Sequence, residues 1–103
     1  PARVAVGGTA AVAVCAAGEV RGAHVEGVDD AEAIAGVTVF HARTARDVEG
    51  RLVTAGGGRI LAVTGEGATV AEARERAYAG IALIRFDGMQ YRSDIAERAG
   101  QRR

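Results

Sequence analysis

The residues best suited to chemistry stand at a run of three glycines followed by an arginine, GGGR at positions 56–59. Glycine permits backbone angles and close approaches that a Cβ would forbid. Backbone amides exposed in such a turn, together with the planar five-donor fork of Arg59, suit a phosphate or a carboxylate. The same residues also suit a plain hairpin turn, in which glycines supply positive φ and the arginine is solvated. The motif alone leaves both interpretations open.

Three other side chains that could do chemistry lie outside any recognisable motif. Cys15 is the only cysteine, so no internal disulfide or thiolate metal cluster can form, and its apolar surroundings favour a small core side chain. His24 and His41 lack the HxH or HExxH spacing of metal ligands. His41 is expected to be a hydrogen-bonded core or edge residue of a strand. We therefore predict no catalytic residue and no metal site.

Composition limits the classes of protein that this chain can represent. With 103 residues, 49% hydrophobic and 25% charged, it is predicted to form one soluble domain, residues 1–103, around a single modest core. The 13 basic residues, all arginine, balance 13 acidic ones, so no net field recruits nucleic acid or an anionic membrane. No apolar stretch of about 18 residues and no signal-peptide pattern are present. These features predict a cytoplasmic protein without a membrane span.

The glycine run is flanked by segments with the pattern of β-strands. Residues 37–42 alternate with a period of two, and residues 51–55 and 60–64 are further runs rich in β-branched side chains. Residues 9–17 read as a strand of small and β-branched residues. Because hairpin-length links join the three later runs, we predict that they follow one another in an antiparallel sheet rather than a parallel one.

Two helices are expected to interrupt these strands. The stronger signal is a capping box, Thr69 with Glu72 three residues later, followed by apolar residues at spacings of three and four that would face the sheet: Val70, Ala73, Ala77, Ile81 and Ile84. The weaker one is a short helix over residues 31–35, capped by Asp29 or Asp30 and ended by Gly36. The segment from residue 85 onward is expected to cover a sheet edge before its polar end frays.

Four segments occur in the order and spacing of a known family. They are FHART at 40–44, VTAGGGRILAVT at 53–64, AEARERAY at 71–78 and FDGMQYRSDI at 86–95. Together they resemble the C-terminal domain of the phosphoribosylamine-glycine ligase family over roughly residues 9 to 96. Any one of these pieces would be weak, but four in register make the resemblance specific.

The resemblance implies a fold and a reaction. The fold is α+β and mainly β, a small antiparallel sheet of the rudimentary hybrid-barrel kind (a rudiment single hybrid motif) with flanking helices, packed against an ATP-grasp body. The family's enzyme joins glycine to 5-phosphoribosylamine in purine synthesis, using ATP and magnesium. The sites for ATP, magnesium and glycine belong to the ATP-grasp body, so we expect no cofactor in this chain and no activity from it alone.

The resemblance also assigns a role to the glycine run. In related ATP-grasp ligases of purine synthesis, an arginine at the equivalent strand start helps to hold the 5′-phosphate of the substrate. By that similarity, Arg59 with Gly57 and Gly58 would form a phosphate-binding corner. The resemblance and the donor chemistry of the motif therefore converge on the same residues.

The chain departs from the family pattern at three places. Arg43 replaces the glycine of FHAGT, an extra glycine precedes Arg59, and the loop at 16–22 is shorter and lacks the usual Gly-Tyr-Pro. Two classes of function follow: the substrate-closing domain of a ligase, with the ATP-grasp body in the same or a separate chain, or a free-standing, diverged module for binding or oligomerisation. An isolated domain of this kind is expected to expose an apolar patch and to self-associate.

Overall fold

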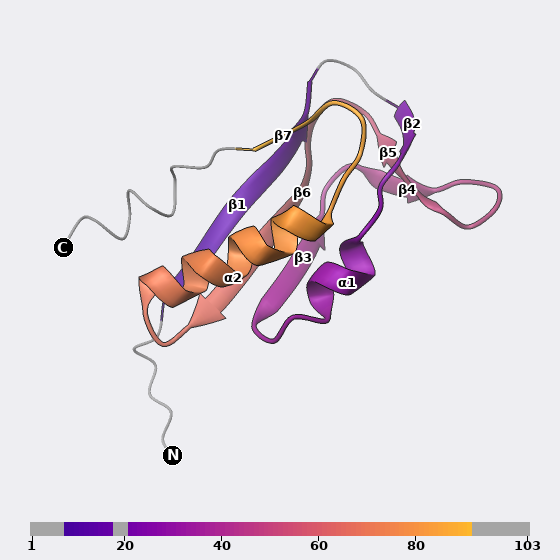
Figure 1. The fold of residues 1–103 in the computed structure, drawn as a ribbon. Coiled ribbons are helices and arrows are strands. Elements are labelled where there is room, and N and C mark those ends of the chain that lie inside the picture. Colours follow the sequence, from indigo (N-terminus) through magenta and orange to yellow (C-terminus); the bar gives the residue numbers. More distant parts are fainter. Residues whose placement is uncertain (1–7, 18–20, 92–103) are drawn as a thin grey trace.

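The computed structural model of the chain describes residues 8–17 and 21–91 (Figure 1). Its strands are β1 (Gly8–Ala16), β2 (Arg21–His24), β3 (Val37–His41), β4 (Thr44–Arg46), β5 (Leu52–Ala55), β6 (Gly58–Gly67) and β7 (Met89–Tyr91), and its helices are α1 (Val28–Glu32) and α2 (Val70–Leu83). The strands of these residues form two open antiparallel sheets and no closed barrel. The predicted α+β, mainly β fold with flanking helices is confirmed.

The larger sheet is built around its two longest strands. Its order is β3-β6-β1-β7, and β1 pairs with β6 from Gly8 opposite Gly67 to Ala16 opposite Gly58. Along β1, buried residues alternate with more exposed ones, as the period of two predicts. The strands predicted at 9–17, 37–42 and 60–64 are thus confirmed as β1, β3 and β6, the last being longer than expected.

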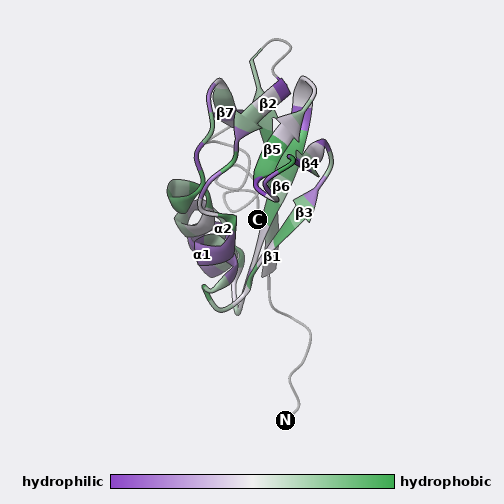
Figure 2. Cartoon of the chain, turned by 90° about the vertical axis from the view of Figure 1, so that its right-hand side faces the viewer, coloured by the Kyte–Doolittle hydropathy of each residue, from purple (hydrophilic) through white to green (hydrophobic). Residues whose placement is uncertain are grey.

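Both helices lie on one face of this sheet (Figure 2). The core fills the space between sheet and helices, and its most buried members include Val12, Val14, Leu61, Val63, Ala73, Ala77 and Ile81. Helix α2 begins as predicted, because the Thr69 side chain accepts a hydrogen bond from the Glu72 amide at 3.1 Å. The Glu72 carboxylate in turn accepts from the Ala68 amide at 2.7 Å. Neither helix of the described residues is long and apolar enough to cross a membrane.

Helix α1 differs from its prediction in both position and cap. It spans Val28–Glu32 rather than residues 31–35, and its N-cap is Gly27, at φ 90°, with no side-chain cap hydrogen bond. A Cβ on Gly27 would lie only 1.7 Å from the carbonyl oxygen of Leu83, so the close approach of α1 to the end of α2 requires glycine. Asp29 and Asp30 therefore fall in the first turn, and Gly36 follows the end of the helix instead of causing it.

The smaller sheet corrects the predicted succession of strands. It has the order β2-β5-β4, so the strand predicted at 51–55 pairs with β2 and β4, whereas β3 pairs with β6 in the larger sheet. Three strands, β2, β4 and β7, were not predicted, because each has only three or four residues. Strand β7 pairs with the outer edge of β1, which confirms the edge-covering expectation for its residues, and residues 92–103 lie outside the described part.

Replacing Ile81 with alanine tests the helix face that packs on the sheet. Ile81 is 2% exposed, so Ile81→Ala should lower the free energy of unfolding by about 2 to 5 kcal/mol through the cavity that it leaves. The matched change Leu83→Ala, at a residue 44% exposed, should cost far less. Urea unfolding measures both, and a loss below about 0.5 kcal/mol for Ile81→Ala would show that the wrong face is assigned to the core.

Candidate functional site

The glycine run carries the chain from one sheet into the other. Strand β5 ends at Ala55 in the smaller sheet, and β6 begins at Gly58 in the larger one, near the top of Figure 1. Gly58 has φ 75°, in the left-handed region that side chains other than glycine rarely adopt. The interpretation as a hairpin turn between two paired strands is therefore wrong, because β5 and β6 do not pair within the described residues.

Arg43 holds both ends of this crossing through its backbone. Its carbonyl accepts a hydrogen bond from the Ala55 amide at 2.9 Å, and its own amide donates to the Ile60 carbonyl at 2.9 Å. Ile60 and the next residue, Leu61, are both fully buried. Because Arg43 is bonded to Ala55 on one side and to Ile60 on the other, the ends of the glycine run are held in place.

Arg59 is the second residue of β6 and is exposed. It lies opposite Cys15, where the ladder between β1 and β6 shifts register. Within residues 8–17 and 21–91, its guanidinium makes no hydrogen bond or ion pair. The group is therefore available to a ligand.

The backbone of the crossing adds hydrogen-bond donors beside Arg59. In the described part of the chain, no hydrogen bond is donated by the amides of Gly56 and Gly57, which lie between the two strands. Gly58 pairs with Ala16 in the ladder, so its position is set by the sheet. An anion approaching the crossing would thus meet at least one unpaired amide next to a guanidinium.

Two further arginines gather at the same crossing. The Nη1 of Arg21 donates to the Ala55 carbonyl at 3.3 Å, and the Nη1 of Arg43 is 3.5 Å from the point where a Cβ on Gly56 would stand. Sequence reasoning missed both as site residues, although Arg43 was recognisable as a departure from the family pattern. Guanidinium and amide groups donate hydrogen bonds and arginine keeps its charge, so the corner suits binding of an anion rather than proton transfer.

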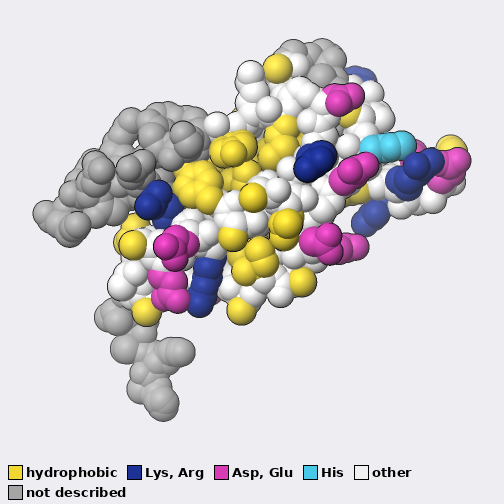
Figure 3. Space-filling model, viewed as in Figure 1, with side chains coloured by type: hydrophobic (Ala, Val, Ile, Leu, Met, Phe, Trp, Pro, Cys, Tyr) yellow, Lys and Arg dark blue, Asp and Glu magenta, His cyan; other side chains and the backbone are white. Residues whose placement is uncertain are grey.

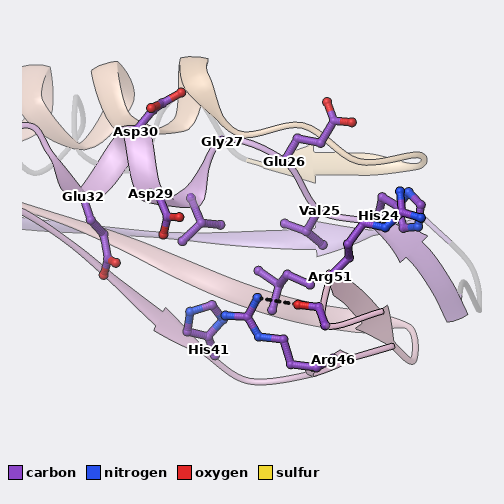
Figure 4. Close-up of a pocket in the computed structure, with 13 residues that line it drawn as sticks. His24, Val25, Glu26, Gly27, Asp29, Asp30, Glu32, His41, Arg46 and Arg51 are labelled. Atoms are coloured by element: carbon purple, nitrogen blue, oxygen red, sulfur yellow. Dashed lines mark hydrogen bonds between the residues drawn. The ribbon is translucent and has the colours of Figure 1, made fainter. Parts of the chain in front are cut away.

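A separate polar hollow of about 590 Å³ lies between α1 and the β4–β5 hairpin (Figure 4). Acidic residues border it from α1 and the segment before it, and basic ones from the hairpin: Glu26, Asp29, Asp30, Glu32, Arg46 and Arg51. The carboxylates of Glu26 and Asp30 point away from the hairpin (Figure 4). Several of these have structural duties, since Glu32 accepts from the Val39 amide at 3.1 Å and Arg46 donates to the Gly50 carbonyl at 3.2 Å. The hollow does not include Arg59 or the glycines of the crossing.

The remaining sequence candidates take ordinary structural positions. The Nδ1 of His41 lies 3.0 Å from the Thr44 hydroxyl at an exposed strand end, which confirms a hydrogen-bonded edge residue. Cys15 is only half-buried, on the face of β1 away from the core residues Val14 and Ala16, so its assignment to the core is wrong. In the described ranges, no three His, Cys, Asp or Glu side chains gather as potential metal ligands.

One carboxylate near the hollow has a perturbed titration. Asp47 accepts hydrogen bonds from the amides of Glu49 and Arg51, each at 2.9 Å, and His24 lies 3.6 Å away. The bond from the Arg51 amide is the main cause that lowers the pKa of Asp47 below its ordinary value. The hydrogen bonds to the Asp47 carboxylate stabilise the turn between β4 and β5. They do not involve Arg59 or the glycines of the crossing.

Comparison with known proteins identifies a family model that spans the described region and relatives that match most of the chain. The family model for the phosphoribosylglycinamide synthetase C domain matches residues 7–98. Similar proteins include the phosphoribosylamine–glycine ligases of Leifsonia xyli subsp. xyli, 50% identical over 78 residues, and of Caulobacter vibrioides, 49% identical over 86 residues. These matches cover 76% and 84% of this chain but only 19% and 18% of the relatives. The chloroplastic enzyme of Arabidopsis thaliana is 46% identical over 80 residues, 77% of this chain and 15% of its own. The chain thus spans less than a fifth of the length of these relatives.

Substitution of Gly58 tests the geometry of the crossing. An alanine there would be forced into the left-handed region, so Gly58→Ala should reduce the free energy of unfolding by about 1 to 2 kcal/mol. No atom lies within 4 Å of the added Cβ, so the cost would come from the backbone and not from a clash. Gly58→Asn, which tolerates this conformation better, should lose less in urea unfolding. Equal stability of Gly58→Ala and the unmodified chain would contradict the assigned backbone.

Proposed function

The chain belongs to the phosphoribosylglycinamide synthetase C-domain family. We propose that it is the substrate-closing C-terminal domain of a phosphoribosylamine–glycine ligase. In this role, residues 1–103 form a single cytoplasmic domain that completes the substrate site of an enzyme joining glycine to 5-phosphoribosylamine with ATP. The observation that carries the proposal is the match of the family model to residues 7–98, together with about half of the residues identical in ligases of that name. It favours this function over a free-standing binding module.

Within that enzyme, the corner of Arg59, Gly57 and Gly58 binds the 5′-phosphate of the substrate. Three properties support this role: the Arg59 guanidinium is exposed, the Gly57 amide has no acceptor in the described residues, and Arg43 fixes both ends of the crossing. Charge-assisted hydrogen bonds from a guanidinium and an amide are the usual way to hold a phosphate. A donor set held in place before binding also loses less entropy when the ligand arrives.

Phosphate binding at a distance from the reacting amine contributes to catalysis by positioning. Binding energy from a remote part of a substrate can orient the reacting group and raise the rate of a step that occurs elsewhere. The family resemblance places the sites for ATP and magnesium on the ATP-grasp body. We therefore expect this chain alone to have no ligase activity.

The open face of the larger sheet is the proposed contact with that body. Both helices cover the opposite face (Figure 2), and the open one carries small or apolar side chains: Ala11, Ala13, Thr38, Phe40, Ala62 and Thr64. Phe40 is 59% exposed. On the helix side, by contrast, hydrophobic side chains are interspersed with charged ones (Figure 3). Because the chain spans less than a fifth of its relatives, the rest of the ligase, in the same or a separate chain, is the expected occupant of the open face.

Removal of the Arg59 side chain tests the phosphate site. Arg59→Ala should weaken binding of ribose 5-phosphate by about 1.5 to 3 kcal/mol, the range for hydrogen bonds to charged groups. The melting temperature should barely change, because Arg59 is exposed and has no protein partner among the described residues. Isothermal titration and thermal melts measure the two effects, and binding should weaken as salt is added.

Arg85→Ala is the matched control, since it removes an exposed arginine outside the corner. It should leave binding unchanged. Unchanged titration of Arg59→Ala with a lowered melting temperature would instead show a structural arginine, and the site assignment would be withdrawn.

Because this face of the sheet is exposed, we also expect the chain to self-associate in the absence of the rest of the ligase. A second copy should cover the exposed face, giving a dimer or larger oligomer at micromolar concentration. Phe40→Ser should weaken this association at least about tenfold, because buried aromatic side chains dominate interface energies. Val48→Ser is the control, since Val48 is fully exposed but lies in the turn after β4. Sedimentation showing only monomer across that range would count against the proposal.

A further inference from the structure

The Arg43 side chain lies beside the glycine run, and its backbone is hydrogen-bonded to a residue on each flank of that run. Its Nη1 and Cδ atoms lie 3.5 and 3.6 Å from the position that a Cβ on Gly56 would occupy, so the side chain lies beside this glycine. Arg43 is exposed, and within the described residues no carboxylate forms an ion pair with it. Its charge is therefore compensated by solvent alone in this part of the chain.

The backbone places the residues Arg43 and Arg59 at opposite ends of the glycines. Arg43 is bonded to Ala55 on one side of the glycines and to Ile60 on the other, and Arg59 immediately precedes Ile60. One arginine thus stands at the first glycine of the crossing, and the other directly follows the last. The amide of Gly57 lies between these two positions in the chain.

Arg43 and Arg59 flank the glycines, with Arg21 also at the crossing, and this gathering of cations favours a ligand with two negative charges. Like charges near each other are unfavourable unless an anion or solvent separates them, and a dianion relieves this repulsion most. A phosphate monoester carries about 1.5 to 2 negative charges at neutral pH and presents three acceptor oxygens. Two planar forks can share these oxygens, which a carboxylate with two oxygens cannot offer as well.

We propose that Arg43 is the second arginine of the phosphate site, binding the phosphate monoester of a sugar from the Gly56 side while Arg59 binds it from the other. This inference rests on the proposed function of the corner and names a further binding residue for it. Arg43 contributes twice: its backbone sets the position of the glycines, and its side chain supplies the second cation. A side chain that only shields Gly56 would stabilise the fold without affecting the ligand.

The experiment is a titration of the 103-residue chain with ribose 5-phosphate by calorimetry. Arg43→Ala should weaken binding about tenfold or more. Arg43→Lys, which keeps the charge but loses the fork, should fall between Arg43→Ala and the unmodified chain. Arg46→Ala is the matched control, because Arg46 is an exposed arginine three residues along the chain whose guanidinium donates to Gly50. The affinity of Arg46→Ala for ribose 5-phosphate should differ from that of the unmodified chain by less than about twofold.

A second readout separates binding from structure. The second phosphate pKa is about 6, so lowering the pH from 7.5 to 5.5 converts most of the dianion to the monoanion. The unmodified chain should lose affinity over this interval, and Arg43→Ala should lose much less because the Arg43 cation is already gone. Melting temperatures of Arg43→Ala and Arg43→Lys report whether either change disturbs the fold.

The outcomes distinguish this inference from the proposed function. If the unmodified chain binds and Arg59→Ala weakens binding while Arg43→Ala does not, the phosphate corner stands and the role of Arg43 is overturned. If the unmodified chain does not bind ribose 5-phosphate at all, the corner itself is wrong and Arg43 falls with it. If Arg43→Ala lowers the melting temperature and Arg43→Lys binds like the unmodified chain, a shielding role replaces the proposed one.

Discussion

The crossing from the smaller sheet into β6 is the constraint on which the rest of the structure depends. β6 pairs with β3 on one side and β1 on the other, so its register sets the larger sheet. A shift by one residue would move Leu61 and Val63 from the core to the open face. The ladders with β1 and β3 hold this register, and the Arg43 bonds to Ala55 and Ile60 fix the strand where it begins. The same bonds hold the donors of the proposed phosphate corner, so stability and the proposed binding share one element.

Local patterns were enough to predict the long elements of this fold. β1, β3, β6 and α2 each have a periodic run of apolar residues, and α2 has a capping box that the structure confirms. The membership of β5 in a second sheet could not be predicted, because strand pairing depends on contacts far apart in the sequence. The start of α1 was missed for a similar reason: Gly27 is required by its approach to Leu83, which no local pattern reveals.

The candidate site, like the fold, could be predicted only where neighbouring residues in the sequence determine it. The donor chemistry of Arg59 and its glycines could be recognised from four consecutive residues and from the family resemblance. The convergence of Arg21 and Arg43 on those glycines depends on how β2 and the bend after β3 lie against the crossing. In the sequence, Arg43 was visible only as a replaced glycine. Its two backbone hydrogen bonds and its position over Gly56 belong to the folded chain alone.

We propose that the glycine crossing is the surface where this domain binds the phosphate of its substrate. The most direct measurement is a nuclear magnetic resonance titration of the isotope-labelled chain with ribose 5-phosphate, following every backbone amide. We expect the largest shifts at residues 56–59 and at Arg43, with smaller ones elsewhere. Largest shifts at His41 and Arg46, in the polar hollow, or no shifts at all, would contradict it.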